Sequence, residues 1–248
     1  MADPRFTFQG YEELISHILD CGYTFADYHN YHGIKRPCIL RHDVDYDIHR
    51  AAQFAEQEAK IHSGLKSTYF LLVSGDFYNI MAKSTIEAAD RILSCGHEIG
   101  LHFDETKYPV KGNAGLYAEY VGEELDILGR ALKTKVSTVS MHRPTRFTLE
   151  GDLKFHSAVN SLSEELFTKF KYLSDSRMRW REDAYSIIKS KEHERLQVLT
   201  HPFWYSEREE TTRDKLLSFI SRANKDRYGC LSNNFSRLEE FVRPEDIR

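Results

Sequence analysis

Short apolar runs alternate with amphipathic stretches along most of the chain. Residues 11–19 place apolar side chains at i, i+3, i+4, i+7 and i+8, the spacing of one helix face, and Gly22 follows them. Similar patterns predict further helices over 47–62, 77–94, 116–132 and 215–223. Short apolar runs predict buried strands at about 38–45 and over 65–73, 97–103, 136–143 and 196–202.

This alternation predicts an α/β fold with a parallel sheet or barrel. Residues 144–195 lack a clear period, so loops or insertions are expected there. No repeat, low-complexity tract or linker divides the chain. We therefore expect a single domain over 1–248, with an N-terminal helical extension over about 1–36. In such folds the chemical groups gather at the carboxyl ends of the strands.

The composition narrows the possible functions. With 248 residues, 41% of them hydrophobic, the chain can bury a sizeable core. Its 34 basic and 38 acidic residues give a net charge of −4, which offers no general attraction for nucleic acid. A nucleic-acid-binding function is therefore disfavoured.

The cysteines and the N-terminus bear on the cellular compartment. The four cysteines are far apart and form no C-x-x-C pair, which is typical of reduced thiols in a cytosolic protein. The first residues lack a basic start followed by an apolar core, so they do not resemble a signal peptide. The longest apolar runs, such as 69–73, are too short to span a bilayer. We expect a cytoplasmic protein.

The strongest local signal is the run Arg41-His42-Asp43-Val44-Asp45 at the end of the first predicted strand. Because strand side chains alternate between faces, Asp43 and Asp45 point the same way. Two carboxylates at the end of a buried strand repel each other unless a cation or a shared proton compensates. The pair therefore indicates metal binding or acid–base chemistry, with a structural ion-pair network as the alternative.

A second cluster occupies 96–104. If this run is a strand, His102 and Asp104 share one face with Gly100, whose small size leaves room beside the imidazole. His102 is therefore the best candidate for a metal ligand. His97 lies in phase with the apolar residues, and we expect it to be a hydrogen-bonded structural histidine.

A third cluster, at 140–144, places His142 and Arg143 at the end of a predicted strand. Pro144 ends the strand and favours an extended conformation for the residue before it. By strict alternation His142 and Arg143 face opposite ways. Both can reach one site only if Pro144 bends the strand.

Two further clusters, at 173–180 and 199–204, each end with one of the two tryptophans, Trp180 and Trp204. Aromatic rings beside carboxylate and imidazole groups can form a wall on which a sugar stacks. Tryptophan is also a good core residue, so a purely structural role is the alternative.

Carboxylates and imidazoles from separate strands, without a thiolate cluster, suit a catalytic Zn²⁺ or another first-row ion with one position left open. Such an ion polarises a carbonyl and lowers the pKa of bound water toward about 7. One aspartate would then bind the metal while the other takes the proton of the water. A histidine across the site could protonate a leaving amine.

Taken in order, the motifs resemble those of the polysaccharide deacetylase-like (NodB-homology, carbohydrate esterase family 4-like) family. They are Arg-His-Asp-Val-Asp, His-Glu-Ile-Gly-Leu-His, Arg-Pro, Asp-Ser with a nearby Trp, and Leu-Thr-His. The resemblance spans about residues 38–204, and the order of five motifs is more specific than any one of them. It implies a distorted (β/α) barrel, usually with seven parallel strands, and metal-dependent removal of an acyl group from an N-acyl sugar.

The resemblance also implies a metal centre that contains Asp45 and His102. The second histidine ligand of the family, four residues after the first, would fall at Thr106, which is a poor ligand. A branch of the family with the Arg-His-Asp-Val-Asp motif uses an acidic residue two after the histidine and a histidine before the third motif. These positions correspond to Asp104 and His142. We expect His142 as the third ligand, with Asp104 as the alternative.

The catalytic groups follow from the same resemblance. Asp43 looks like the catalytic base, and His201 looks like the general acid that pairs with Asp175. Arg143 is similar to the arginine that orients the base. Val44 separates the two aspartates that are usually adjacent in the family, so either carboxylate could be the metal ligand.

We therefore predict a cytoplasmic, metal-dependent amide hydrolase that acts on an N-acylated sugar, such as a sugar nucleotide or a lipid-linked precursor of a surface polysaccharide. Two alternatives are a degenerate barrel that binds a glycan or a partner enzyme, and a hydrolase of another small amide. Arginines that could hold a phosphate, or instead pair with carboxylates and helix ends, are Arg41, Arg143, Arg177 and Arg179. The candidate substrate-binding residues are Asp104, Arg179, Trp180 and Trp204.

Overall fold

A buried strand forms the centre of the fold. β2 (Pro37–Val44) is buried at every position and pairs with neighbours on both sides. The computed structural model describes residues 3–247. Because β2 ends one residue before Asp45, the first polar motif lies at the carboxyl end of this central strand.

Seven parallel strands form one sheet in the order β6-β5-β4-β3-β2-β8-β7, and a short strand, β1 (Thr24–Ala26), pairs with the start of β2. β6 and β7 are the two edges, so the barrel is open on that side. This distorted (β/α) barrel is the fold expected from the sequence. The remaining strands are β3 (Ser67–Leu71), β4 (Glu98–Asp104), β5 (Thr138–His142), β6 (Val159–Asn160), β7 (Lys171–Ser174) and β8 (Leu196–Thr200).

The register brings the motif residues to one end of the sheet. Asp104 at the end of β4 lies opposite His142 at the end of β5. His42 on β2 lies opposite Thr200, the last residue of β8. Because the strands run parallel, their carboxyl ends meet at the same edge.

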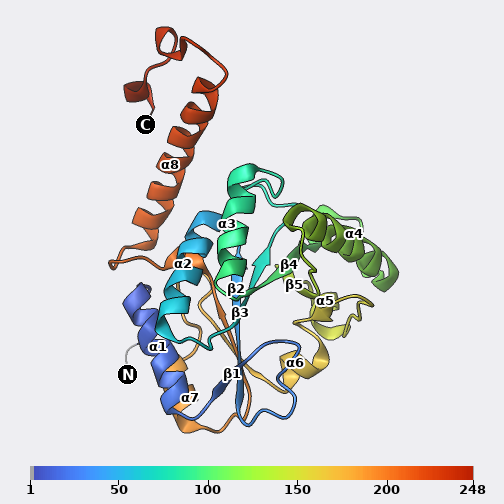
Figure 1. The fold of residues 1–248 in the computed structure, drawn as a ribbon. Helices are drawn as coiled ribbons and strands as arrows, with labels where there is room; N and C mark the ends of the chain where they lie inside the picture. The colour runs from blue at the N-terminus through green and yellow to red at the C-terminus, as the bar shows by residue number, and fades with distance from the viewer. Residues whose placement is uncertain (1–2, 248) are drawn as a thin grey trace. The chain divides into compact units, whose positions relative to one another are not determined.

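Helices connect successive strands and cover the sheet (Figure 1). α2 (Ile48–Ile61) and α3 (Lys83–Ser94) lie side by side, and α4 (Ala114–Leu132) joins β4 to β5. α1 (Phe8–Asp20) ends just before Gly22, whose φ of 83° is a conformation that glycine adopts without strain. Shorter helices are η1 (Glu105–Lys107), α5 (Arg146–Glu150), α6 (Glu164–Thr168), α7 (Ala184–Ser190) and η2 (Pro202–Trp204).

The helix expected over 77–94 begins only at Lys83. The residues before it form a loop that is fixed against the end of β2. The hydroxyl of Tyr78 donates to the carbonyl of Val44 (2.8 Å) and accepts from the amide of Leu72 (2.7 Å). These two hydrogen bonds hold the loop beside the carboxyl end of β2.

The segment 144–195 is more regular than its sequence pattern indicates. It contains three short helices and the two edge strands, β6 and β7. β6 has only two residues, and the first half of β7 is only partly buried. Neither strand is long or buried enough to produce a clear hydrophobic period.

A buried carboxylate ties α1 and α2 to the sheet. Glu58, which is 0% exposed, accepts hydrogen bonds from the hydroxyls of Tyr11 (2.5 Å), Tyr69 (2.6 Å) and Ser67 (2.9 Å). Its carboxylate also lies 3.1 Å from Nε2 of His42. Burial favours the neutral acid, but the neighbouring histidines and hydroxyls outweigh it and lower the pKa of Glu58 to about 2.

His97 precedes β4, and Gly100 lies within it. His97 is a buried structural histidine, as expected: its Nδ1 accepts from the Ser67 amide (3.2 Å), and its Nε2 lies 3.3 Å from the Ala55 carbonyl. Gly100 does not serve to leave room beside His102. An added Cβ would lie 2.6 Å from the ring of Phe70, so glycine is required by packing against β3.

Residues 1–207 and 208–248 form two compact units. All the sheet strands and the polar motifs belong to the first unit. The second unit contains α8 (Thr212–Ser232, red in Figure 1), η3 (Leu238–Glu240) and η4 (Pro244–Asp246). Within residues 3–247, no helix combines the length and the apolar character needed to span a membrane.

Candidate active site

Three side chains from different strands converge at the carboxyl end of the sheet. Asp45 follows β2, His102 lies on β4, and His142 ends β5. Oδ1 of Asp45 lies 3.3 Å from Nε2 of His102 and 3.3 Å from Nδ1 of His142, and these two nitrogens are 3.1 Å apart. One potential ligand atom from each residue lies within 4.8 Å of the others. These are the three residues that were predicted from the sequence to be metal ligands.

The chemistry of the cluster fits a divalent metal ion. Oδ1 of Asp45 is buried and, within the described residues, makes no hydrogen bond despite its two close nitrogen neighbours. Burial alone would raise the pKa of Asp45, but His102, His142 and His201 hold it well below its usual range. One carboxylate oxygen and two imidazole nitrogens, with no thiolate, form a donor set that Zn²⁺ accepts in open, catalytic sites.

Asp43 lies beside this cluster and is held by an arginine. Nε and Nη2 of Arg41 each donate to Asp43 at 2.8 Å, one to each carboxylate oxygen. Nε2 of His102 lies 3.4 Å from the same carboxylate. Burial opposes ionisation, but Arg41 and His102 outweigh it and lower the pKa of Asp43. Asp43 is therefore an ionised, oriented carboxylate that can accept a proton.

His201 forms the second acid–base pair. Its Nδ1 lies 2.6 Å from Oδ1 of Asp175, and its backbone amide donates to Oδ2 of the same residue (3.1 Å). Nε2 of His201 lies 3.8 Å from Oδ2 of Asp45. Burial disfavours the imidazolium, but Asp175 and then Asp45 and Asp43 outweigh it and raise the pKa of His201 to about 9. A protonated His201 can act as a proton donor at neutral pH.

Arg143 does not contact the carboxylate assigned to it from the sequence. Its guanidinium donates to Oδ2 of Asp104 (2.5 Å). The arginine that donates to Asp43 is Arg41. β5 ends at His142, and Arg143 has a φ of 52°, so the chain leaves the strand at this residue rather than continuing to alternate. His142 and Arg143 consequently both line the same cavity, as expected if the strand bends there.

Asp104, the alternative third ligand, is committed to other contacts. Its side chain caps η1 by accepting from the amide (3.1 Å) and hydroxyl (2.7 Å) of Thr106, and it accepts from Arg143. The cluster that includes Asp45 and His102 contains His142 rather than Asp104. Asp104 still lines the cavity, where it was expected to meet substrate.

One cavity of about 870 Å³ is lined by the three candidate metal ligands, by Asp43 and by His201. One wall is aromatic: ring centroids lie 5.3 Å apart for Tyr46 and Phe77 and 6.2 Å apart for Tyr46 and Trp204. Phe77 is 57% exposed, so its ring is open to a ligand. Trp204 was expected in the site. Tyr46 and Phe77 were not, because neither belongs to one of the polar motifs.

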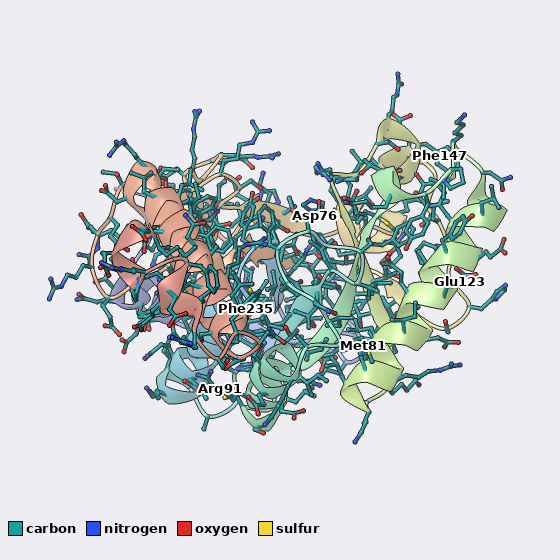
Figure 2. The ribbon with its side chains drawn as sticks, turned by 90° about the horizontal axis from the view of Figure 1, so that it is seen from above. Asp76, Met81, Arg91, Glu123, Phe147 and Phe235 are labelled. Carbon is teal, nitrogen blue, oxygen red and sulfur yellow. The ribbon has the colours of Figure 1, made fainter. Side chains whose placement is uncertain are left out.

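Asp76, one of the residues that line the cavity, is labelled in Figure 2, where it lies nearer the middle of the view than Phe147 on α5 and Glu123 on α4.

Two residues predicted to bind substrate do not line the cavity. The indole of Trp180 is buried and donates to the carbonyl of Pro4 (3.2 Å), so it packs against the N-terminal segment. Arg179 is exposed and outside the cavity lining. From the same loop, Arg177 and Arg181 do line the cavity. A loop has no fixed alternation, so the sequence could not distinguish these positions.

Comparisons with known proteins gave matches only among solved structures. No protein-family model matches the chain. No curated protein matches it either. The matching structures include a CE4-family pseudoenzyme from Bacillus anthracis, at 16% identity and a TM-score of 0.44, covering 83% of this chain and 65% of that one. This chain therefore spans less than two thirds of that protein.

Two further structures are described as deacetylases. One is the chitin deacetylase of the fungus Colletotrichum lindemuthianum, at 14% identity and a TM-score of 0.43, with 76% of this chain and 82% of that chain covered. The other is a Streptococcus pyogenes deacetylase in complex with acetate, at 13% identity and a TM-score of 0.44, with 88% and 89% covered. These distant matches fall in the family that the motifs resemble. The fold assignment rests on the strand order and register described above.

Proposed function

We propose that this protein is a metal-dependent deacetylase that hydrolyses the amide of an N-acylated sugar. The observation that carries the proposal is the arrangement of three units around one cavity. These units are the metal cluster of Asp45, His102 and His142, the ionised Asp43 held by Arg41, and the His201–Asp175 pair.

Asp45, His102 and His142 would hold the metal ion, which we take to be Zn²⁺. A bound ion of this kind supplies Lewis-acid chemistry, because it polarises an acyl carbonyl and lowers the pKa of water. Asp43 is close to this cluster and is not required as a ligand, which supports its assignment as the base.

Asp43 would take a proton from the attacking water, because Arg41 keeps its carboxylate ionised and fixed in direction. His201 would donate a proton to the departing amine, because Asp175 keeps the imidazole oriented and protonated. The amide C–N bond breaks, and the products are a carboxylic acid and the free amino sugar. The two groups thus divide the roles of base and acid.

The substrate would be an N-acetylated sugar on a nucleotide or a lipid carrier, in the biosynthesis of a surface polysaccharide and within the cytoplasm. The aromatic wall of Tyr46, Phe77 and Trp204 provides apolar ring faces beside the acid–base groups. Such faces suit the apolar face of a sugar ring or a nucleobase.

A degenerate barrel is the rival explanation, since one of the similar solved structures is described as a pseudoenzyme. The feature that favours a degenerate barrel is Thr106, which stands where the resembled family has its second histidine ligand. Here the Thr106 hydroxyl donates to Asp104 (2.7 Å), and His142 supplies the third donor of the cluster instead. The complete donor set favours an active enzyme.

The test is acetate release from N-acetyl sugar nucleotides and from small acyl amides, with the zinc-loaded protein and its Asp43→Asn variant. We expect release from the sugars, and a loss of about 10²- to 10⁴-fold in kcat for the variant with metal content unchanged. Turnover of small amides alone would contradict the sugar assignment. An unchanged rate in the variant would contradict the role of Asp43 as the base, and no turnover with no bound metal would favour the degenerate barrel.

A further inference from the structure

Among the residues that the structure describes, two arginines on the cavity wall have no carboxylate partner. Arg177 and Arg181 belong to the loop between β7 and α7, and both are exposed where they line the cavity. Within residues 3–247, neither side chain takes part in an ion pair or a hydrogen bond. Exposed guanidinium groups beside a binding cavity are available to a ligand.

The other cationic side chains that line the cavity are already matched by carboxylates. The pairs are Arg41 with Asp43, Arg143 with Asp104, and Lys107 with Asp76. The remaining carboxylate of the lining, that of Asp45, faces His102, His142 and His201. Within the described part of the chain, Arg177 and Arg181 are therefore the two cations of the cavity wall that form no ion pair with an acidic side chain.

The loop that presents these arginines is tightly turned and anchored at the catalytic pair. Arg177 and Met178 have φ values of 61° and 56°, a left-handed conformation that side-chain-bearing residues rarely adopt in succession. The amide of Arg179 donates to the carbonyl of Asp175 (3.2 Å), the residue that orients His201. Strained backbone of this kind is concentrated at ligand-binding sites.

Arg177 and Arg181 line the same cavity as the aromatic wall of Tyr46, Phe77 and Trp204. A group bound by these arginines would therefore share the cavity with the rings that we assign to the sugar or the base.

We propose that Arg177 and Arg181 form an anion subsite that binds the phosphate or diphosphate of the substrate. Guanidinium groups match phosphate oxygens in a bidentate geometry. The substrate class is then an N-acylated sugar attached to a phosphate, carried by a nucleoside or by an isoprenoid lipid. This inference rests on the proposed function for the reaction itself, but the binding of the anion can be measured without turnover.

The first experiment measures the binding of uridine diphosphate to the zinc-loaded protein by calorimetry. The variants are Arg177→Gln with Arg181→Gln, and a matched control, Arg146→Gln. Arg146 is an exposed arginine of α5 that pairs with Glu150 and lies outside the cavity lining. We expect the double variant to bind uridine diphosphate about 10- to 100-fold more weakly than the parent, because it loses charge-assisted hydrogen bonds. The control variant should bind uridine diphosphate as tightly as the parent. Equal affinity in the double variant and the parent overturns the subsite.

The second experiment compares three substrates: uridine diphosphate N-acetylglucosamine, a short isoprenoid diphosphate N-acetylglucosamine, and the neutral methyl glycoside of N-acetylglucosamine. The double variant should raise KM for the phosphorylated substrates and leave the methyl glycoside unaffected. The phosphorylated substrate with the higher kcat/KM identifies the carrier. A parent enzyme that prefers the neutral glycoside contradicts the proposal.

The two experiments separate the subsite from the reaction. If no substrate is hydrolysed but diphosphate binding depends on Arg177 and Arg181, the deacetylase function fails while the anion subsite stands. If acetate is released but the two arginines affect neither affinity nor KM, the function stands and the subsite fails. Equal melting temperatures of all variants exclude an effect on folding.

Discussion

At the scale of single residues, the site contains two charged pairs in which one partner holds the other in its ionised form. Arg41 holds Asp43 ionised, and Asp175 holds His201 protonated. An ionised carboxylate and a protonated imidazole are the states that a base and an acid need at the start of a hydrolysis.

The first prediction concerns Arg41→Lys. Lysine keeps the positive charge but loses the bidentate contact with Asp43, so we expect kcat/KM to fall about 10- to 100-fold through poorer positioning of the base. Because Arg41 lowers the pKa of Asp43, weakening the contact should move the acidic limb of the pH–rate profile to higher pH. Metal content serves as the control and should not change. A profile identical to that of the parent would show that Arg41 does not act on the base.

The second prediction concerns Asp175→Asn. Activity through a protonated His201 is lost as the pH rises through its pKa, which is about 9. Removing Asp175 takes away the main cause that raises this pKa, so the alkaline limb of the pH–rate profile should move to lower pH. We also expect kcat to fall about 100-fold or more. Asp183→Asn, at the exposed N-cap of α7, is the matched control and should leave the alkaline limb of the pH–rate profile unchanged. An unchanged alkaline limb in Asp175→Asn would contradict the assignment of His201 as the acid.

The sequence was sufficient to bring Asp45, His102 and His142 together but not to identify the residue that holds Asp43. Strand alternation and the order of motifs together placed Asp45, His102 and His142 in one site. The same alternation puts Arg41 on the face of Asp43, a signal that was present in the sequence but was not used. Arg143 was assigned to Asp43 instead, because its left-handed backbone conformation cannot be seen in a sequence.

At the scale of elements, a buried polar cluster connects the helices to the sheet. Glu58 of α2 joins Tyr11 of α1, Tyr69 of β3 and His42 of β2. Removing the charge of a buried, multiply hydrogen-bonded carboxylate leaves its donors poorly satisfied. This cluster should therefore contribute to stability and not to catalysis directly.

The third prediction is that Glu58→Gln lowers the free energy of unfolding by about 2–4 kcal/mol at neutral pH. The pKa of Glu58 falls from 4.5 to about 2 on folding, so its contribution is present above about pH 4.5 and is lost as the pH falls toward 2. Denaturant unfolding of parent and variant at several pH values measures this. The stability gap should narrow in acid, and a gap that widens there would contradict the account.

Element length explains which parts of the fold could be predicted. The helices α1, α2 and α4 and the central strands have enough residues to show a period, and they were located to within a few residues. The longest helix, α8, was predicted over 215–223 but continues to Ser232. The two-residue β6 and the half-exposed β7 have too few buried positions to leave a pattern. The loop before α3 was mistaken for helix, since the hydrogen bond from Tyr78 to Val44 that fixes the loop joins residues 34 positions apart and leaves no local pattern.

At the scale of the whole molecule, the proposed metal ion would cross-link three strands. Its ligands come from the ends of β2, β4 and β5, which are separated by long stretches of sequence. An ion that binds only the folded state stabilises it by mass action.

The fourth prediction is therefore a metal-dependent melting temperature. With free Zn²⁺ at about 100 times its dissociation constant, the stabilisation is about 2.7 kcal/mol. For a chain of this size we expect an increase in Tm of about 5–10 °C over the chelator-treated protein. Asp45→Asn is the control and should show little increase. The same increase in that variant would place the stabilising ion elsewhere.

The most direct test of the account is anomalous diffraction at the zinc absorption edge from crystals of the zinc-loaded protein. We predict one strong peak at about 2.0–2.2 Å from Asp45 Oδ1, His102 Nε2 and His142 Nδ1, with Asp43 still held by Arg41. A peak at other side chains, or none at the ends of β2, β4 and β5, would contradict the metal-dependent site on which the proposed function rests.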